Sequence, residues 1–291
     1  MKGKITKGVG GFYTVLTDDK NLITCSVKGI FRNKNITPTV GDDVIVQFKD
    51  NGYVISQISE RKNMLIRPNV ANVSQVMIVM ACLKPEPNFL ILDKLTAICE
   101  DKNLKVIICF NKTDLADAAK INEIKRIYEK TPYNIHFINA KNKAIGSIED
   151  ALYNNTTVLA GPSGVGKSTL LNCICPDFYL NTGEISEKIG RGKHTTRHTE
   201  LLTLNESAYI ADTPGFTNID MSEIDIENLK YCFAEFSKFE GMCKYASCMH
   251  DQEPDCRIKA AVKNDEISKS RYESYINIKN EISSNPRSYK K

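Results

Sequence analysis

The chain has 291 residues, of which 42% are apolar, and a formal net charge of +4 at pH 7. This length predicts two or three domains, and the apolar content is sufficient for buried cores. The sequence has no run of eighteen apolar residues and residues 1–4 lack the apolar stretch of a signal peptide, so we expect a cytoplasmic protein without a membrane partner. Without an export signal, most of the ten cysteines are expected to be reduced thiols rather than a disulfide set.

Residues 1–65 are predicted to form a small β-barrel. Apolar and polar positions alternate in 12–16 and 44–48, and turn-forming pairs such as Gly10-Gly11 separate the segments. Five short strands in this length fit an oligonucleotide-binding fold, and an SH3-like barrel fits the periodicity equally well. Barrels of the first kind commonly bind RNA through strand faces and loops. A barrel that binds only protein, or nothing, is the alternative.

Residues 66–220 are predicted to form a second, α/β domain. Repeated strand–helix–strand units predict a mainly parallel, doubly wound sheet with its ligand loops at the C-terminal ends of the strands. The expected strands are 73–83, 104–110, 135–138 and 157–160, and the expected helices are 89–101 and 116–130.

Two loops of this domain carry a guanine-binding pattern. An Asp that ends an Asn-Lys-x-Asp loop can accept hydrogen bonds from guanine N1–H and the exocyclic amine, which adenine does not offer. Taken alone, these four residues could equally be a polar turn. The second loop follows the strand at 135–138, where the Ala140 N–H could be donated to guanine O6. The predicted base-binding residues are Asn111, Lys112, Thr113, Asp114, Asn139, Ala140 and Lys141.

A phosphate-binding loop follows the strand at 157–160 and precedes a helix that begins near Ser168. Its glycines allow consecutive N–H groups to point at the β-phosphate, and the helix N-terminus adds partial positive charge. Lys167 is expected to bridge the β- and γ-phosphates, Ser168 to bind Mg²⁺ and Thr169 to reach the α-phosphate. The predicted loop consists of Gly161, Pro162, Ser163, Gly164, Val165, Gly166, Lys167, Ser168 and Thr169.

The order of the motifs is unusual. Residues 111–114 come before the phosphate loop, whereas ordinary GTPases have the phosphate loop first; Asp212-Thr213-Pro214-Gly215 comes after both. Asp212 is expected to hold the Mg²⁺ shell, and the Gly215 N–H to contact the γ-phosphate. The order indicates a circularly permuted GTPase.

Residues 221–291 are predicted to form a mostly helical, zinc-binding domain. Cys243, Cys248, His250 and Cys256 provide three thiolates and one imidazole within fourteen positions, which fits a closed, structural Zn²⁺ site. An incidental His in a cysteine-bearing loop is the alternative. Helices are expected at 229–239 and, with basic and amphipathic character, at 257–280; a basic helix is either an RNA contact or a solvated face.

These motifs, together with the basic segment 190–197, resemble in sequence and order those of the bacterial small ribosomal subunit biogenesis GTPases, the ribosome small-subunit-dependent GTPase A family. The resemblance covers nearly the whole length. It implies an oligonucleotide-binding barrel, a permuted GTPase domain and a zinc domain that act in late maturation of the small subunit. It also implies GTP and GDP as ligands, hydrolysis stimulated by the small subunit, and contact with its rRNA. The absence of heptads favours a monomer.

The group that positions the attacking water is not evident from the motifs. Many GTPases place a Gln after Asp-x-x-Gly, but this chain has Phe216, which cannot orient water. His194 is the candidate for this role, with Thr195 or Thr196 as the hydroxyl that senses Mg²⁺; the alternative is that His194 contacts RNA or solvent only. Two other functions are considered: a nucleotide-gated RNA-binding scaffold whose hydrolysis is incidental, and an ATPase or kinase with a chance Asn-Lys-x-Asp.

Overall fold

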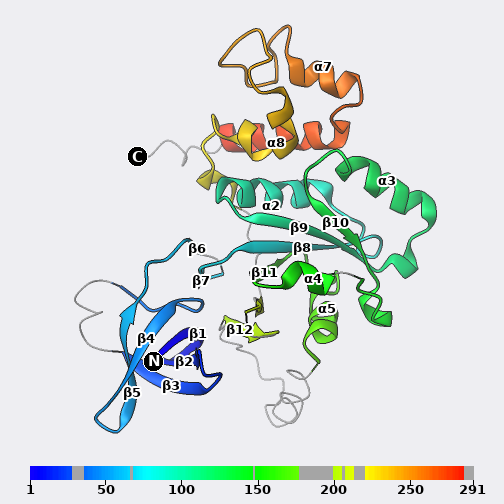
Figure 1. The fold of residues 1–291 in the computed structure, drawn as a ribbon. Coiled ribbons are helices and arrows are strands. Elements are labelled where there is room, and N and C mark those ends of the chain that lie inside the picture. The colour runs from blue at the N-terminus through cyan, green and yellow to red at the C-terminus, as the bar shows by residue number, and fades with distance from the viewer. Residues whose placement is uncertain are drawn as a thin grey trace. The chain divides into compact units, whose positions relative to one another are not determined.

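The computed structural model describes residues 1–27, 36–65, 68–146, 148–176, 199–204, 207–212 and 220–284. The chain separates into two compact units. The first contains 1–75, 147–159 and 168–216, and the second contains 76–146, 160–167 and 217–291. Figure 1 shows the elements in chain order. The predicted division into domains 1–65, 66–220 and 221–291 stays a prediction.

The N-terminal part of the first unit is a five-stranded barrel. Its strand order is β1-β2-β3-β5-β4, with β4 pairing back onto β1 and β3 running parallel to β5. Alternate residues such as Ile5, Val15 and Ile55 are fully buried inside it. A five-stranded Greek-key barrel closed in this way confirms the oligonucleotide-binding type. The strands are β1 Lys2–Val9, β2 Phe12–Thr17, β3 Leu22–Val27, β4 Asp43–Lys49 and β5 Gly52–Ile58.

Apart from two short strands at 64–71, the rest of the first unit comes from much later in the chain. Strand β11 is parallel to β13, and β12 is antiparallel to β13. The barrel meets this group of strands through β1, which pairs with β12 at Lys7 and Glu200. The elements are β6 Met64–Leu65, β7 Val70–Ala71, α4 Ile148–Leu152, β11 Thr156–Ala160, α5 Lys167–Ile174, β12 Glu200–Thr203 and β13 Tyr209–Asp212.

The second unit is built on strands β10, β9 and β8, adjacent in that order, with β10 parallel to β9. Strand β8 is buried along its whole length, as expected for a sheet covered on both faces. Helix α2 packs against β9, and α8 lies along α2 (Figure 1). The elements of the α/β part are β8 Gln75–Ala81, α2 Phe89–Asp101, β9 Lys105–Asn111, η1 Thr113–Leu115, α3 Ala118–Tyr128, β10 Asn134–Phe137 and η2 Ala140–Asn142.

The C-terminal part of the second unit differs from prediction in two places. The helix expected at 229–239 is instead two 3₁₀ turns, because Phe233 between them has a non-helical backbone and packs its ring 5.3 Å from that of Tyr275. The helix expected at 257–280 is broken, because Asp265 has φ of +58° and an α-helix cannot continue through that conformation. The elements are η3 Met221–Glu223, η4 Leu229–Cys232, η5 Ala234–Phe239, α7 Arg257–Lys263 and α8 Lys269–Ser284.

No helix in the part of the chain that the structure describes is long and apolar enough to cross a membrane. None of the ten cysteines, all of which are among the described residues, forms a disulfide. Of the seven cysteines outside the predicted metal cluster, all are buried except Cys173, which is half-buried, so simple burial accounts for them as expected.

Candidate nucleotide and metal sites

The side-chain amide of Asn111 joins the two predicted nucleotide loops. Asn111 ends strand β9 and is 3% exposed. Its Nδ2 donates to the Val165 carbonyl of the phosphate loop at 3.0 Å. Its Oδ1 accepts from the backbone N–H of Lys112 at 2.8 Å and from that of Ala140 at 3.0 Å. One buried side chain therefore fixes the base loop, the phosphate loop and the loop after β10 with respect to one another.

Lys112 strengthens the same junction. Its backbone is left-handed, with φ of +62°, which turns the chain from β9 into η1. Its Nζ donates to the carbonyls of Gly164 at 2.7 Å and Lys84 at 2.5 Å. Two residues further on, Asp114 is exposed on η1, as a carboxylate must be to accept from a base. Burial, with a smaller effect of the Asp114 charge, raises the pKa of the nearby Cys82 thiol to about 11.

The phosphate loop requires glycine at two positions for steric reasons. Gly161 has φ of +128°, and a Cβ there would lie 2.1 Å from the Val79 carbonyl oxygen. Gly166 has φ of +96°, and a Cβ there would lie 2.3 Å from Asn111 Nδ2. Any side chain at either position would collide with its neighbour, so only glycine fits these two turns of the loop.

The polar side chains that follow the loop stand at the start of α5. Lys167 Nζ donates to the carbonyls of Gly161 at 2.8 Å and Pro162 at 2.6 Å, so its ammonium lies within the loop. Ser168 and Thr169 are exposed in the first turn of α5. An ammonium within a glycine-rich loop and hydroxyls at the start of the following helix are groups that bind phosphates and Mg²⁺.

Asp212 is the last residue of β13, which is parallel to β11, the strand that leads into the phosphate loop. Asp212, the residue predicted to hold the Mg²⁺ shell, therefore ends a strand that is hydrogen-bonded to β11. Gly215, His194, Thr195 and Thr196, which were also predicted to act on the nucleotide, lie outside the described residues.

Two of the predicted base-loop residues have local partners. The Ala140 N–H, expected to reach guanine O6, is donated to Asn111 Oδ1 at 3.0 Å. The side chain of Asn139 accepts from the Asn142 N–H at 3.2 Å, which shapes the turn that carries Ala140. The contact of Ala140 with the base stays a prediction.

The four predicted metal ligands converge in space. The ligand atoms of Cys243, Cys248, His250 and Cys256 all lie within 4.8 Å of one another. His250 Nδ1 is 3.6 Å from the Cys243 sulfur and 3.4 Å from the Cys256 sulfur, and those two sulfurs are 4.0 Å apart. In a tetrahedral zinc site, bond lengths of about 2.3 Å to sulfur and about 2.05 Å to nitrogen give about 3.6 Å between N and S and about 3.8 Å between two S atoms. The cluster therefore has the right size for zinc.

Groups behind the ligands hold them in place. His250 has a left-handed backbone, with φ of +58°, and its carbonyl accepts from the Tyr272 hydroxyl at 2.8 Å. Burial lowers the pKa of the His250 imidazole, which favours the neutral form that binds metal. The Arg257 N–H donates to the Cys243 sulfur at 3.3 Å, and Glu253 accepts from two backbone N–H groups of the same loop. Outer contacts of this kind orient metal ligands.

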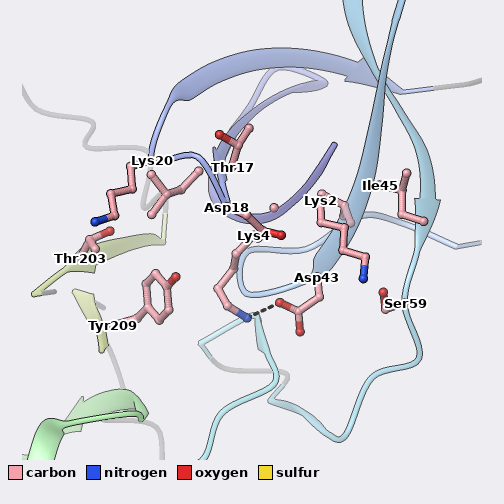
Figure 2. Close-up of a pocket in the computed structure, with 13 residues that line it drawn as sticks. Lys2, Lys4, Thr17, Asp18, Lys20, Asp43, Ile45, Ser59, Thr203 and Tyr209 are labelled. Atoms are coloured by element: carbon pink, nitrogen blue, oxygen red, sulfur yellow. Dashed lines mark hydrogen bonds and ion pairs between the residues drawn. The ribbon is translucent and has the colours of Figure 1, made fainter. Parts of the chain in front are cut away.

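A pocket of about 610 Å³ lies in the first unit, where the barrel meets β12 and β13. Figure 2 shows Lys4 directed at Asp43, with the Tyr209 ring beside it. Lys4 Nζ is 2.7 Å from the Asp43 carboxylate and 5.6 Å from the centre of the Tyr209 ring. Since Tyr209 begins the strand that ends at Asp212, this contact connects the barrel to a strand of the nucleotide site.

The sequence does not reveal the structural roles of two residues, one beside the nucleotide loops and one in the core of the second unit. Lys84, whose carbonyl binds the Lys112 ammonium, lies in a Lys-Pro-Glu-Pro segment that marks a turn but not its partner. Arg271 was placed on a basic helix with an exposed or RNA-binding face, yet it is fully buried with Asp93 and Glu235. The signal available was an arginine at the spacing of apolar residues in 267–282.

A guanine loop hydrogen-bonded to a phosphate loop that follows it in the chain defines a circularly permuted P-loop GTPase. Two family models match the sequence: RsgA GTPase over residues 58–222 and RsgA N-terminal domain over residues 2–54. The chain belongs to the RsgA family of small ribosomal subunit biogenesis GTPases, and is therefore a GTP-hydrolysing enzyme.

Relatives and solved structures match along nearly the whole chain. The small ribosomal subunit biogenesis GTPases RsgA of Clostridium beijerinckii and Clostridium kluyveri are each 46% identical over 285 residues, which cover 97% and 98% of this chain and 97% and 99% of theirs. The crystal structure of YjeQ from Thermotoga maritima aligns with a TM-score of 0.85 at 34% identity, covering 98% of this chain and 99% of that one. YloQ, described as a circularly permuted GTPase, aligns with a TM-score of 0.82 at 34% identity over 97% and 94%.

Proposed function

We propose that this GTPase hydrolyses GTP in response to the small ribosomal subunit, late in that subunit's maturation, and contacts its rRNA. The proposal is carried by the hydrogen bonds of the Asn111 amide, which join the base loop to the phosphate loop. The relatives in this family are named for small-subunit biogenesis. The oligonucleotide-binding barrel supplies a surface suited to RNA. Because small subunits mature in the cytoplasm, we propose that the protein acts there, and that it acts as a monomer.

In this proposal the nucleotide lies between the two loops. Asp114 accepts from the guanine edge, and Asn111, Lys112, Thr113, Asn139 and Lys141 shape the base pocket. Ala140 would donate its N–H to O6 in exchange for its present hydrogen bond to Asn111 Oδ1. The N–H groups of residues 161–166 and the Lys167 ammonium hold the phosphates, and Thr169 reaches the α-phosphate. Ser168 and Asp212 would hold Mg²⁺, which neutralises charge on the β- and γ-phosphates, and Gly215 would sense the γ-phosphate.

We further propose that His194 positions the attacking water, with Thr195 or Thr196 contacting the Mg²⁺ ion. The sequence supports this because Phe216 occupies the position where many GTPases have Gln. Slow hydrolysis by the free protein and fast hydrolysis on the subunit follow from such an arrangement. A His194→Ala protein with unchanged stimulated turnover would remove His194 from this role.

The cluster of Cys243, Cys248, His250 and Cys256 is proposed to hold one structural Zn²⁺. The interatomic distances support the assignment. All four ligands come from the protein, so no position is open for catalysis, and the ion would fix a loop that has little core of its own.

The test is GTP hydrolysis by the purified protein alone, with small subunits and with large subunits, using ATP in parallel. Strong stimulation by small subunits only, with ATP inactive, is the expected result. GTP binding without stimulation would contradict the proposal and favour the alternative of a nucleotide-gated RNA-binding scaffold.

A further inference from the structure

Three residues on three adjacent strands occupy one row of the sheet in the first unit. In the antiparallel pair of β1 and β12, Lys7 is opposite Glu200. In the antiparallel pair of β12 and β13, Glu200 is opposite Asp212. The row therefore begins in the barrel with a cation and ends at the residue that is proposed to hold the Mg²⁺ shell.

The middle residue of the row has the same charge as its neighbour in β13. Residues at opposed positions of an antiparallel pair have Cβ atoms about 4.5–5.5 Å apart, and like charges placed there are destabilising. Glu200 nevertheless stands opposite Asp212. A carboxylate at position 200 therefore needs a compensating cation.

Lys7 supplies that cation from the barrel. Its Nζ lies 2.9 Å from Glu200 Oε2, so the carboxylate is held towards β1. The side chains of Lys7 and Glu200 are 42% and 32% exposed, and ion pairs this accessible to solvent contribute little to folding stability. We therefore expect the pair to affect the charge near the nucleotide rather than the fold.

The barrel also contacts the other end of β13. Lys4, which is on β1 like Lys7, has its Nζ 5.6 Å from the centre of the Tyr209 ring, and Tyr209 is the first residue of β13. Strand β13 is thus in contact with the barrel where it begins. Where it ends, at Asp212, the link to the barrel runs through Glu200 and Lys7.

We infer that Lys7 is a positioning residue of the GTPase site and that it acts through Glu200. Its ammonium keeps the Glu200 carboxylate at the barrel, so that a second carboxylate does not add negative charge beside the Mg²⁺ position. Two strand spacings of about 4.8 Å separate β1 from β13, which exceeds the Debye length of about 8 Å at physiological salt. Lys7 therefore has little direct effect on the ion. The inference rests on the proposed role of Asp212 in holding Mg²⁺.

The test measures binding of a fluorescent GDP analogue and of Mg²⁺ by the full-length protein at about 0.15 M salt. GDP affinity is measured in EDTA, and free Mg²⁺ is then titrated while release of the analogue is followed. Lys7→Met frees the Glu200 carboxylate, whose charge repels phosphates and attracts Mg²⁺. GDP should therefore bind roughly three- to tenfold more weakly without Mg²⁺, and Mg²⁺ should slow release at a roughly three- to tenfold lower concentration.

Glu200→Gln should suppress this change. By itself it removes a carboxylate that Lys7 already neutralises, so both measurements should stay near the wild-type values. Combined with Lys7→Met, it should restore wild-type binding. Lys7→Arg keeps the cation and should behave as the wild type. Lys2→Met is the matched control and should change neither measurement, because Lys2 is on the same strand but opposite Ile45 of β4.

Unchanged binding in Lys7→Met, or an equal change in Lys2→Met, overturns the inference. Similar defects in Lys7→Met and Glu200→Gln that the double variant does not relieve, with lowered unfolding midpoints, would assign the pair to the fold alone and also overturn it.

Asp212→Asn tests the basis of the inference separately. It should raise the Mg²⁺ concentration that slows release of the GDP analogue. If it does not, the proposed role of Asp212 is wrong and the inference about Lys7 falls with it. If Asp212→Asn acts as expected and Lys7→Met does not, the proposed function stands and only the inference fails.

Discussion

The guanidinium of Arg271 lies 2.7 Å from the carboxylate of Asp93, and neither side chain is exposed to solvent. Arg271 comes from α8 and Asp93 from α2, 178 residues apart in the chain. The same guanidinium makes two hydrogen bonds to the Glu235 carboxylate, at 2.8 and 3.0 Å, and the Tyr128 hydroxyl donates to Asp93 at 2.9 Å. One buried cation thus joins the C-terminal helix to the α/β part of its unit.

Replacing Arg271 should strongly destabilise the protein. Arg271→Ala leaves two buried carboxylates without their cation, and breaking a buried ion pair in this way costs about 3–5 kcal/mol. The free energy of unfolding, measured with denaturant, should fall by that amount. Lys269→Ala is the control, because the Lys269 side chain is 81% exposed and its pair with Glu273 contributes about 0.5 kcal/mol or less. Equal unfolding midpoints for the two variants would contradict this account.

A methyl group at position 166 should interfere with nucleotide binding. The Cβ of Gly166→Ala would lie 2.3 Å from Asn111 Nδ2 and would push the amide that joins the two loops. GTP affinity, measured by fluorescent nucleotide titration, should fall by roughly tenfold or more, which corresponds to about 1.4 kcal/mol.

Gly146→Ala provides the matched control for Gly166→Ala. Gly146 also has a positive φ, +59°, but a Cβ there meets nothing within 4 Å. Its replacement should therefore cost about 1 kcal/mol of stability from backbone strain and leave nucleotide affinity unchanged. Equal losses of GTP affinity in both variants would indicate backbone strain rather than contact with Asn111.

Base specificity should follow the side chain at position 114. Asp114→Asn replaces an acceptor pair with an amide, so GTP affinity should fall by roughly 10- to 100-fold while xanthosine triphosphate becomes the better ligand. Asp117→Asn is a suitable control, since the Asp117 side chain caps α3 by accepting from the Lys120 N–H and Asn caps equally well. A variant at 114 that still prefers GTP would place base recognition elsewhere.

Loss of a single cluster thiolate should release the metal. Cys248→Ser is expected to lower zinc content, measured by mass spectrometry of metals, from about one ion per chain towards zero, because a closed site uses all four ligands. Cys232→Ala changes a buried thiol of the same region that is not in the cluster, and should retain the ion. Full zinc content in Cys248→Ser would exclude Cys248 as a ligand.

The contribution of Glu253 to the stability of the loop that carries His250 should depend on pH. Burial raises the pKa of Glu253, but the backbone N–H groups of Met249 and Asp251 outweigh it and lower the pKa from 4.5 to about 2. Because the pKa of Glu253 is lower in the folded than in the unfolded protein, its ionised carboxylate stabilises the fold at any pH above the unfolded-state pKa. This stabilisation is lost as the pH falls towards 2.

The wild type should therefore be more stable than Glu253→Gln by a constant amount between pH 7 and 5. This advantage should shrink as the pH falls from about 4.5 towards 2. Denaturant unfolding of both proteins at matched metal content measures it. A stability difference between wild type and Glu253→Gln that grows on acidification would show that the pKa of Glu253 is raised, not lowered, by folding.

The nucleotide and metal motifs could be predicted from the sequence because each is a short, contiguous pattern with its chemistry on adjacent residues. The barrel could be predicted as a barrel, but its type depended on the parallel pairing of β3 and β5, which periodicity does not encode. The base loop was found, whereas the Asn111–Val165 hydrogen bond was not, since it joins residues 54 positions apart.

The C-terminal region was the least predictable for the same reason. The Asn264-Asp265 pair is a local signal for a helix end, but apolar spacing resumes at Ile267, and the prediction of one helix over 257–280 passed over the left-handed Asp265 that follows α7. Arg271 was assigned to an exposed or RNA-binding face because charge normally favours solvent. Its burial depends on Asp93 and Glu235, which belong to other elements.

The Asn111–Val165 hydrogen bond also has a consequence for the order in which the protein is made. Synthesis proceeds from the N-terminus and domains form as their residues emerge. In this chain the loop that selects the base emerges before the loop that holds the phosphates, and the Asn111 amide gains its Val165 partner only when a further 54 residues have been added. A nascent chain therefore has a base loop but no phosphate loop until residue 167 has emerged, so GTP cannot act as a ligand that guides the earlier steps of folding.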